Sequence, residues 1–333
     1  MLMVLGLALT VVAATASGAV SVPFLVTAKV ILYKLGLLQA DSVTRSQEAI
    51  IFYVRLPRVV VAVLVGAALA TSGTVMQGMF RNPMADPGII GVSSGASLGA
   101  VAAIALGLTA RSIYFMPLFA AAGAFAAASL VFLLAARGGK VPVLTLILAG
   151  VAVSAFIGAV TSLTLTLVNE YQVREYLFWS VGSLSARRWE HVNLVALPIL
   201  VCIAILMAFA RDLNVLVLGE EEAHSLGLNP ARARKQLLFF SSVTTAMAVS
   251  VSGHISFVGL IVPHIMRLTV GPDHRILLPA SAAAGAIFLV GCDLAARTVI
   301  APAEIGVGIV TSLLGAPYLL YLLYRARKEG TAL

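Results

Sequence analysis

Few side chains of this sequence have the type and the spacing that chemistry requires. Asp293 is the one acidic residue deep within an apolar segment, and Arg297 follows one helical turn later, where it can neutralise the carboxylate. Cys202 and Cys292 are the only cysteines, and neither belongs to a pair with ligand spacing. The pattern indicates a buried ion pair and gives no sign of a disulfide framework or a zinc site.

The sequence also lacks a phosphate-binding loop. Its nearest approach, Gly138-Gly139-Lys140, has neither the first glycine of a P-loop nor the hydroxyl residue that would hold magnesium. No segment resembles a channel selectivity filter, and no apolar segment is dense in the carboxylates that proton-coupled pumps use. The chain is therefore not expected to hydrolyse ATP, to be an enzyme or to carry a cofactor.

Composition indicates an integral membrane protein. Of 333 residues, 60% are hydrophobic and only 11% are charged, and the mean hydropathy is +1.03. A soluble domain has about 25% charged residues. The net charge of +8 is spread singly or in short groups between apolar segments, without a basic face, so it indicates loop topology rather than nucleic-acid binding.

Apolar segments recur along the whole chain and predict an all-α membrane protein of about ten spanning helices in a single domain over 1–333. The predicted spans are 2–28, 57–80, 88–109, 113–136, 141–168, 192–210, 235–252, 256–270, 276–299 and 305–324. The N-terminal segment resembles a signal peptide but lacks its basic region, so we interpret it as the first span. Gly253 and Pro263 favour a break between the seventh and eighth spans.

Small residues recur at helical spacing in the second and third spans. They are Ala62, Gly66, Ala70, Thr74 and Gly78, followed by Gly91, Gly95 and Gly99. Such stripes let neighbouring backbones approach closely, so they predict helix packing rather than a functional site.

Two polar segments are longer than turns. Residues 169–191 mix aromatic and basic residues, which is typical of a helix at the membrane interface on the outer side. Residues 211–235 predict a short helix, a glycine, an acidic helix from Glu220 to Leu226, a stop at Gly227, and Pro230 at the start of the next helix. A compact helical loop of this kind is well shaped to fit a groove in a partner protein.

Charge counting gives only weak guidance on orientation. With both termini in the cytoplasm, 12 of the 22 Lys and Arg residues lie inside and 10 lie outside. This is a weak positive-inside bias, and the many external arginines need an explanation of their own.

Several blocks of the sequence, in order along nearly the whole chain, resemble one family. The first blocks are Arg55-Leu56-Pro57-Arg58, Gly66-Ala67-Ala68-Leu69-Ala70, Asn82-Pro83-Met84-Ala85-Asp86-Pro87 and Gly91-Val92-Ser93-Ser94-Gly95-Ala96. Later blocks are Leu218-Gly219-Glu220, Phe257-Val258-Gly259-Leu260, Pro263-His264, Asp273-His274-Arg275 and Leu314-Gly315-Ala316-Pro317. They resemble the permease subunits of type II ABC importers, a FecCD/BtuC-like family that carries ferric siderophores, haem or cobalamin.

The resemblance implies a fold, partners and site residues. It implies ten helices per subunit, a homodimer in the bacterial or archaeal inner membrane, a cytoplasmic ATPase subunit for each permease, and an extracytoplasmic substrate-binding protein. The ATPase would bind the loop between the sixth and seventh spans, through residues Leu218, Gly219, Glu220, Glu221, Glu222, His224, Leu226 and Gly227. The alternative interpretation of this loop is a solvated acidic helix.

The resemblance also assigns roles at the outer face and along the path. Arg55, Arg58 and Arg297 match the arginines that meet acidic residues of the binding protein, a role that suits bidentate guanidinium groups. The alternative is that they extend toward lipid headgroups. The translocation path would be lined by parts of the second, third, fifth and tenth spans, and four residues match its cytoplasmic gate. These are Asn82, Met84, Val143 and Leu144.

The substrate is not fixed by the sequence. Ferric siderophore comes first on generality, haem second and cobalamin third, because Val143 and Leu144 replace hydroxyl residues of the cobalamin branch. His254 departs from the family pattern and could touch an iron chelate, although an interfacial histidine without a ligand is the simpler interpretation. The rival function is an ATP-independent secondary transporter, which would have no need of the helical loop at 211–235.

Overall fold

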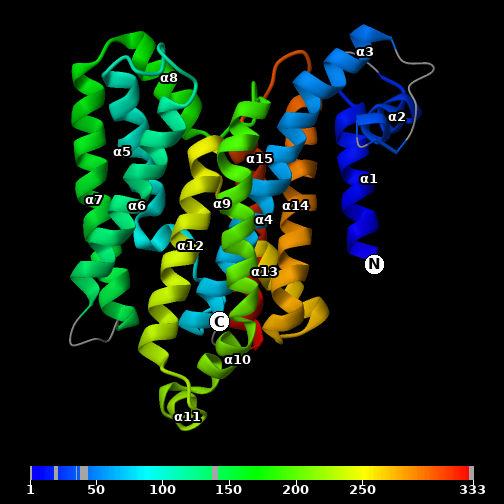
Figure 1. Ribbon diagram of the computed structural model, residues 1–333. Helices are drawn as coiled ribbons and strands as arrows, with labels where there is room; N and C mark the ends of the chain where they lie inside the picture. The colour runs from blue at the N-terminus through cyan, green and yellow to red at the C-terminus, as the bar shows by residue number, and fades with distance from the viewer. Residues whose placement is uncertain (1, 19–21, 35, 38–43, 137–141, 330–333) are drawn as a thin grey trace.

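The structure of the protein, a computed structural model, describes residues 2–18, 22–34, 36–37, 44–136 and 142–329. Within these ranges every regular element is a helix (Figure 1). In chain order they are α1 (Leu2–Ala16), α2 (Phe24–Lys34), α3 (Arg45–Ala49), the π-helix η1 (Ile50–Arg55), α4 (Leu56–Phe80), the 3-10 helix η2 (Pro87–Ile90), α5 (Val92–Ala105), α6 (Phe115–Ala135), α7 (Val143–Leu167), α8 (Glu170–Ser180), α9 (Trp189–Ala208), α10 (Ala210–Leu218), α11 (Glu220–Ser225), α12 (Pro230–Ser252), α13 (Val258–Val270), α14 (His274–Thr298) and α15 (Val307–Glu329).

Six of these helices are long and apolar enough to cross a membrane. They are Arg45–Phe80, Phe115–Ala135, Val143–Leu167, Trp189–Ala208, His274–Thr298 and Val307–Arg325. The apolar helices Met3–Ala16, Val92–Ala105 and Val258–Val270 are shorter, and α12 carries three basic residues near its start. Each predicted span therefore corresponds to a helix, and the count of ten membrane crossings stays a prediction.

The first predicted span was wrong in its extent. It was expected to reach residue 28, but α1 ends at Ala16 and a separate helix, α2, begins at Phe24. The guanidinium of Arg55 occupies the space beside Gly18, where an added Cβ would lie 2.8 Å from Nη2. Arg55 and Arg297 donate hydrogen bonds to the last carbonyls of α1, so the helix is capped where it ends.

The break between the seventh and eighth spans is confirmed at Gly253. Helix α12 ends at Ser252, Gly253 has a φ of +70°, and α13 begins at Val258. Positive φ suits glycine, which has no Cβ to clash with the preceding carbonyl. Pro263, by contrast, lies inside α13 and does not divide it.

Helix α4 forms the core of the molecule, and its small residues explain how. In its most apolar window 83% of residues are buried, against 22% in α7. A Cβ at Gly66 would overlap the carbonyl of Gly285 in α14, and one at Gly73 would overlap the carbonyl of Gly259 in α13. Gly66 belongs to the predicted stripe and Gly73 directly precedes its member Thr74, so this part of α4 is a packing surface on which backbone meets backbone.

The second stripe has the same role in a second bundle. Gly95 of α5 faces Gly123 of α6 so closely that a Cβ on either glycine would overlap the other's carbonyl. Gly99 likewise faces the carbonyl of Phe119. Helices α5, α6 and α7 pack together on one side of α12, whereas α4, α13 and α14 lie on its other side (Figure 1).

A substitution at Gly73 tests the packing argument. We expect Gly73→Ala to destabilise the fold by about 1–3 kcal/mol, because the added methyl group has backbone rather than a movable side chain against it. The measurement is thermal unfolding in detergent. Gly291→Ala is the matched control, since an added Cβ there meets nothing within 4 Å; equal melting temperatures for the two variants would contradict the argument.

Candidate functional site

The loop between α9 and α12 folds as the sequence predicts. Helix α10 buries Leu213 and Leu216, Gly219 separates it from the acidic helix α11, and Gly227 reverses the chain with a φ of +82°. Asn229 then caps α12 by accepting a hydrogen bond from the backbone N–H of Arg232 at 3.0 Å. The loop is a compact pair of helices, and it projects from one end of the molecule (Figure 1).

The tip of this loop exposes apolar and acidic side chains together. Leu218 and Leu226 are 60% and 65% exposed, and Glu221 and Glu222 are also exposed. Glu220 forms an ion pair with Arg234 of α12, which fixes α11 against the next helix. His224 and Gly227 are exposed as well, and Gly219 is buried. Exposed leucines beside a run of glutamates are typical of a surface that a partner covers.

Three residues tie α10 to the core helices. Asn214 donates from Nδ2 to Asp273 Oδ1 at 2.6 Å, and its Oδ1 accepts from the backbone N–H of His274 at 3.0 Å. The same oxygen lies 2.7 Å from His274 Nδ1. Hydrogen bonds from the Arg275 backbone and from Asn214 lower the pKa of Asp273. Asn214 thus binds α10 directly to the first turn of α14.

A fourth contact joins α10 to α4. Arg81 ends α4 in a left-handed conformation, with a φ of +50°, and its Nε donates to the carbonyl of Leu216 at 3.3 Å. Non-glycine residues reach this conformation at a cost of about 1–2 kcal/mol. The C-terminal end of α4 and the N-terminal end of α14 are therefore both bonded to α10. They lie at the end of the molecule that carries α11, which we call the α11 end.

The predicted gate residues lie on two elements near the α11 end. Asn82 and Met84 occupy the turn after α4, where Asn82 Oδ1 accepts from the backbone N–H of Met84 at 2.8 Å. Val143 and Leu144 begin α7, and Leu144 is 69% exposed. Among the described residues no hydrogen bond or ion pair joins the two pairs, so their shared role as a gate stays a prediction.

The start of α7 lies next to the projecting loop. A cavity of about 820 Å³ is lined by Pro142, by Glu220, Glu221 and His224 of α11, and by the beginning of α12. Pro142 directly precedes Val143 and Leu144. The start of α7 and helix α11 therefore face the same cavity.

At the opposite end of the molecule, arginines cap the carbonyl end of α1. Arg55 donates from Nη1 to the carbonyls of Thr15 and Ala16 at 3.1 and 2.7 Å. Arg297 donates from Nη1 to Ser17 O at 2.8 Å and from Nη2 to Ala14 O. The last carbonyls of a helix have no hydrogen-bond partner within it and carry the negative end of its dipole. The two guanidinium groups donate hydrogen bonds to these carbonyls and place positive charge beside the dipole.

Asp293 pairs with Arg297 and with Arg58, and the sequence analysis missed Arg58, the closer of the two partners. Arg58 donates from Nε to both carboxylate oxygens at 3.0 and 3.1 Å and from Nη2 at 2.9 Å. Arg297, the predicted partner, forms a longer ion pair of 3.6 Å. Arg58 also donates from Nη1 to Glu304 at 2.9 Å. Arg58 lies 235 residues from Asp293 in the chain, and no local spacing could have revealed the pair.

The three predicted docking arginines are less accessible than expected. Arg55 and Arg297 are 6% and 8% exposed, and the side chain of Arg58 is 12% exposed. In this structure they organise α1, α4 and α14. Their contact with a binding protein stays a prediction.

The two histidines occupy different surroundings. His254 Nε2 lies 2.9 Å from Ser256 Oγ, and His254 lines a cavity of about 210 Å³ with Asp86 and Thr245. His264 packs against Tyr318 with ring centroids 6.2 Å apart. In the part of the chain that the structure describes, no three metal-ligating side chains come together.

The comparisons with known proteins agree with this architecture. The chain is 50% identical over 282 residues to the cobalamin import system permease protein BtuC of Halobacterium salinarum, covering 84% of this chain and 75% of the relative. It is 44% identical over 279 residues to the hemin transport system permease protein HmuU of Yersinia pestis, covering 83% of each. A solved structure of a metal-chelate type ABC transporter in an inward-facing conformation superposes with a TM-score of 0.85, at 36% identity and 97% coverage of both chains.

Apolar helices long enough to span a membrane, in an architecture that matches a solved ABC transporter, indicate a membrane permease subunit. The FecCD transport family matches residues 6–325, and the chain belongs to it. The protein is therefore a permease of the type II ABC importer class and lies in the inner membrane.

Removing the Asp293 carboxylate, which lies between Arg58 and Arg297, should lower the stability of the fold. We expect Asp293→Ala to destabilise the protein by about 3–5 kcal/mol, because Arg58 and Arg297 would keep their charges in a buried site without a carboxylate between them. Thermal unfolding in detergent measures the loss.

Glu304→Gln provides the control for this substitution. It removes a partner of Arg58 whose side chain is 41% exposed, so the expected loss is about 0–1 kcal/mol. A loss at Asp293 as small as that at Glu304 would show that the cluster does not hold the helices together.

Proposed function

We propose that the chain forms the membrane path of a homodimeric importer, which carries a metal chelate inward and is driven by separate ATPase subunits. The observation that carries the proposal is the α10–α11 loop, with its exposed leucines and glutamates and its direct bonds to α4 and α14. A secondary transporter without an ATPase would have no use for such a loop. On this proposal the α11 end faces the cytoplasm.

The contacts of α10 supply a route for coupling. Asn214 bonds to the start of α14, Arg81 bonds from the end of α4 to Leu216, and the cavity beside α11 reaches Pro142 at the start of α7. An ATPase that pulls or pushes α11 therefore acts on the two core helices and on the proposed gate. Alternating access then follows as a shift in population between outward and inward states.

A homodimer accounts for the least buried helices. In their most apolar windows only 22% of α7 and 28% of α15 is buried within one chain. These helices match the predicted fifth and tenth spans, which we assign to the path along the dimer axis together with parts of α4 and α5. The second copy would cover the faces that one chain leaves open.

An extracytoplasmic binding protein completes the proposed complex at the opposite end. Arg55, Arg58 and Arg297 gather there, and Glu304, the exposed partner of Arg58, marks the accessible edge of the cluster. Acidic residues of the binding protein would compete with Glu304 for Arg58. Docking at this site would therefore loosen the bonds that join α1, α4 and α14.

For the substrate, we place a metal tetrapyrrole ahead of a ferric siderophore. The relatives at 50% and 44% identity are named for cobalamin and hemin, whereas the earlier preference for a siderophore rested on generality alone. Cobalamin comes first because its relative is the more similar of the two, and this similarity outweighs the replacement of hydroxyl residues by Val143 and Leu144.

Transport in proteoliposomes tests the function. The permease is reconstituted with its ATPase and its binding protein, and cobalamin, haem and a ferric siderophore are offered separately with ATP on the ATPase side. We expect accumulation of one tetrapyrrole, only with ATP, and its loss in Glu221→Lys through failure of the ATPase to bind. Glu170→Lys, an exposed change in α8 far from the loop, is the control. Equal flux without ATP would favour the secondary transporter.

Asn214→Ala tests the coupling route. We expect at least about a fivefold fall in substrate transported per ATP hydrolysed, the lower range of typical coupling energies, because α10 loses its bonds to Asp273 and His274. Binding of the ATPase, measured by co-purification, should not change. Arg211→Ala, an exposed change on the same helix, is the control; transport and hydrolysis falling in equal proportion would contradict the route.

A further inference from the structure

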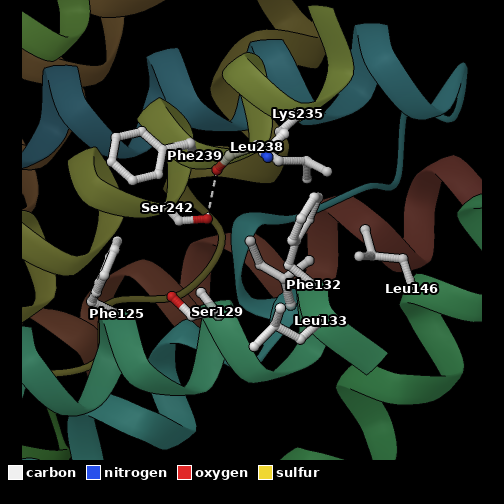
Figure 2. Close-up of a pocket in the computed structure, with 11 residues that line it drawn as sticks. Phe125, Ser129, Phe132, Leu133, Leu146, Lys235, Leu238, Phe239 and Ser242 are labelled. Carbon is white, nitrogen blue, oxygen red and sulfur yellow. Dashed lines mark hydrogen bonds between the residues drawn. The ribbon is translucent and has the colours of Figure 1, made fainter. Parts of the chain in front are cut away.

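A groove between α6 and α12 is not explained by transport. It has a volume of about 320 Å³ and is lined almost entirely by apolar side chains (Figure 2). Its floor consists of buried residues, among them Ile90, Leu146 of α7 and Leu238 of α12. The groove exists because small residues, Ala128 and Ser129 on α6, lie between bulky neighbours.

An aromatic pair and a cation both line the groove. Phe125 and Phe239 meet edge to face, with ring centroids 5.8 Å apart. Lys235 places Nζ 5.8 Å from the centre of the Phe132 ring. Figure 2 shows Lys235 and Phe239 on α12, across the groove from Phe125 and Phe132 on α6. Residues 235 and 242 are two helical turns apart, so the groove runs along α12 for about 10 Å.

Lys235 is not neutralised within the described chain. It is exposed, and among the described residues no carboxylate lies within ion-pair distance of its Nζ, whereas the nearby Arg234 is paired with Glu220. A lysine near the end of a spanning helix extends its ammonium toward the polar membrane surface. The site therefore offers a positive charge at headgroup level directly beside an apolar groove.

We propose that this groove binds an anionic phospholipid from the membrane leaflet at the α11 end, with an acyl chain along its floor and the phosphate beside Lys235. Charge complementarity selects this occupant, because basic pockets between spanning helices are recognised by anionic headgroups. A neutral lipid would fill the groove but leave the lysine unpaired. Free phosphate would pair with the lysine but leave the apolar floor empty.

The proposed lipid site lies close to the projecting loop. Lys235 follows Arg234, which holds Glu220 of the projecting loop. A bound headgroup would therefore sit one residue from the contact that fixes α11 against α12. The bound lipid would therefore lie next to the α10–α11 loop, although no residue of α10 or α11 lines the groove.

Native mass spectrometry of the purified full-length protein tests the proposal. The protein is mixed with phosphatidylglycerol or with phosphatidylcholine of the same chain length. We expect preferential retention of phosphatidylglycerol, and a loss of about fivefold in Lys235→Gln, as removal of one basic residue at a membrane surface produces. Arg211→Gln, an exposed basic residue on α10, is the charge-matched control and should retain the lipid. Glycerol phosphate should not displace it.

A groove-filling variant separates the acyl site from the charge. Ser129→Leu should reduce retention of both lipids, because its side chain would occupy the groove between Phe125 and Phe132. If Lys235→Gln fails to fold, Ser129→Leu alone tests whether lipid occupies the groove. Equal retention of both lipids by the unmodified protein, or equal loss in Lys235→Gln and Arg211→Gln, would overturn the proposal. So would photo-cross-links from the groove to a second copy of the chain instead of to lipid.

Discussion

Backbone contact between α4 and its neighbours is the constraint on which the rest of the structure depends. Because Gly66 and Gly73 have no side chains, α4 lies directly against the carbonyls of Gly285 and Gly259. Association of helices in lipid depends on such close packing, since burial of apolar surface supplies little driving force there. Close packing of α4 fixes the positions of its two ends. Arg58 at one end bonds to Asp293, and Arg81 at the other end bonds to α10.

Helices α4 and α14 consequently behave as one unit that joins the two ends of the protein. At one end Arg58 of α4 binds Asp293 of α14. At the other end both helices reach α10, through Arg81 and through the bonds of Asn214 to the first turn of α14. A packed pair of helices transmits displacement rather than absorbing it, because interiors packed at this density resist compression.

Local patterns predicted the helices, the glycine stripes and the α10–α11 loop, since each depends on residues close together in the chain. Contacts between distant segments could not be predicted in this way. Arg58 and Asp293 are separated by 235 residues, and the last carbonyls of α1 accept hydrogen bonds from Arg55 and Arg297, which lie far along the chain. The family resemblance singled out the three arginines, but their burial became visible only in three dimensions.

The capping of α1 by Arg297 has a consequence for biogenesis. Ser17, whose carbonyl accepts from Arg297, leaves the ribosome 280 residues before its partner. Exposed carbonyls in a bilayer are costly, so α1 gains its full set of capping bonds only after α14 has been synthesised. Completion of the end that carries the arginines therefore requires segments from both halves of the chain.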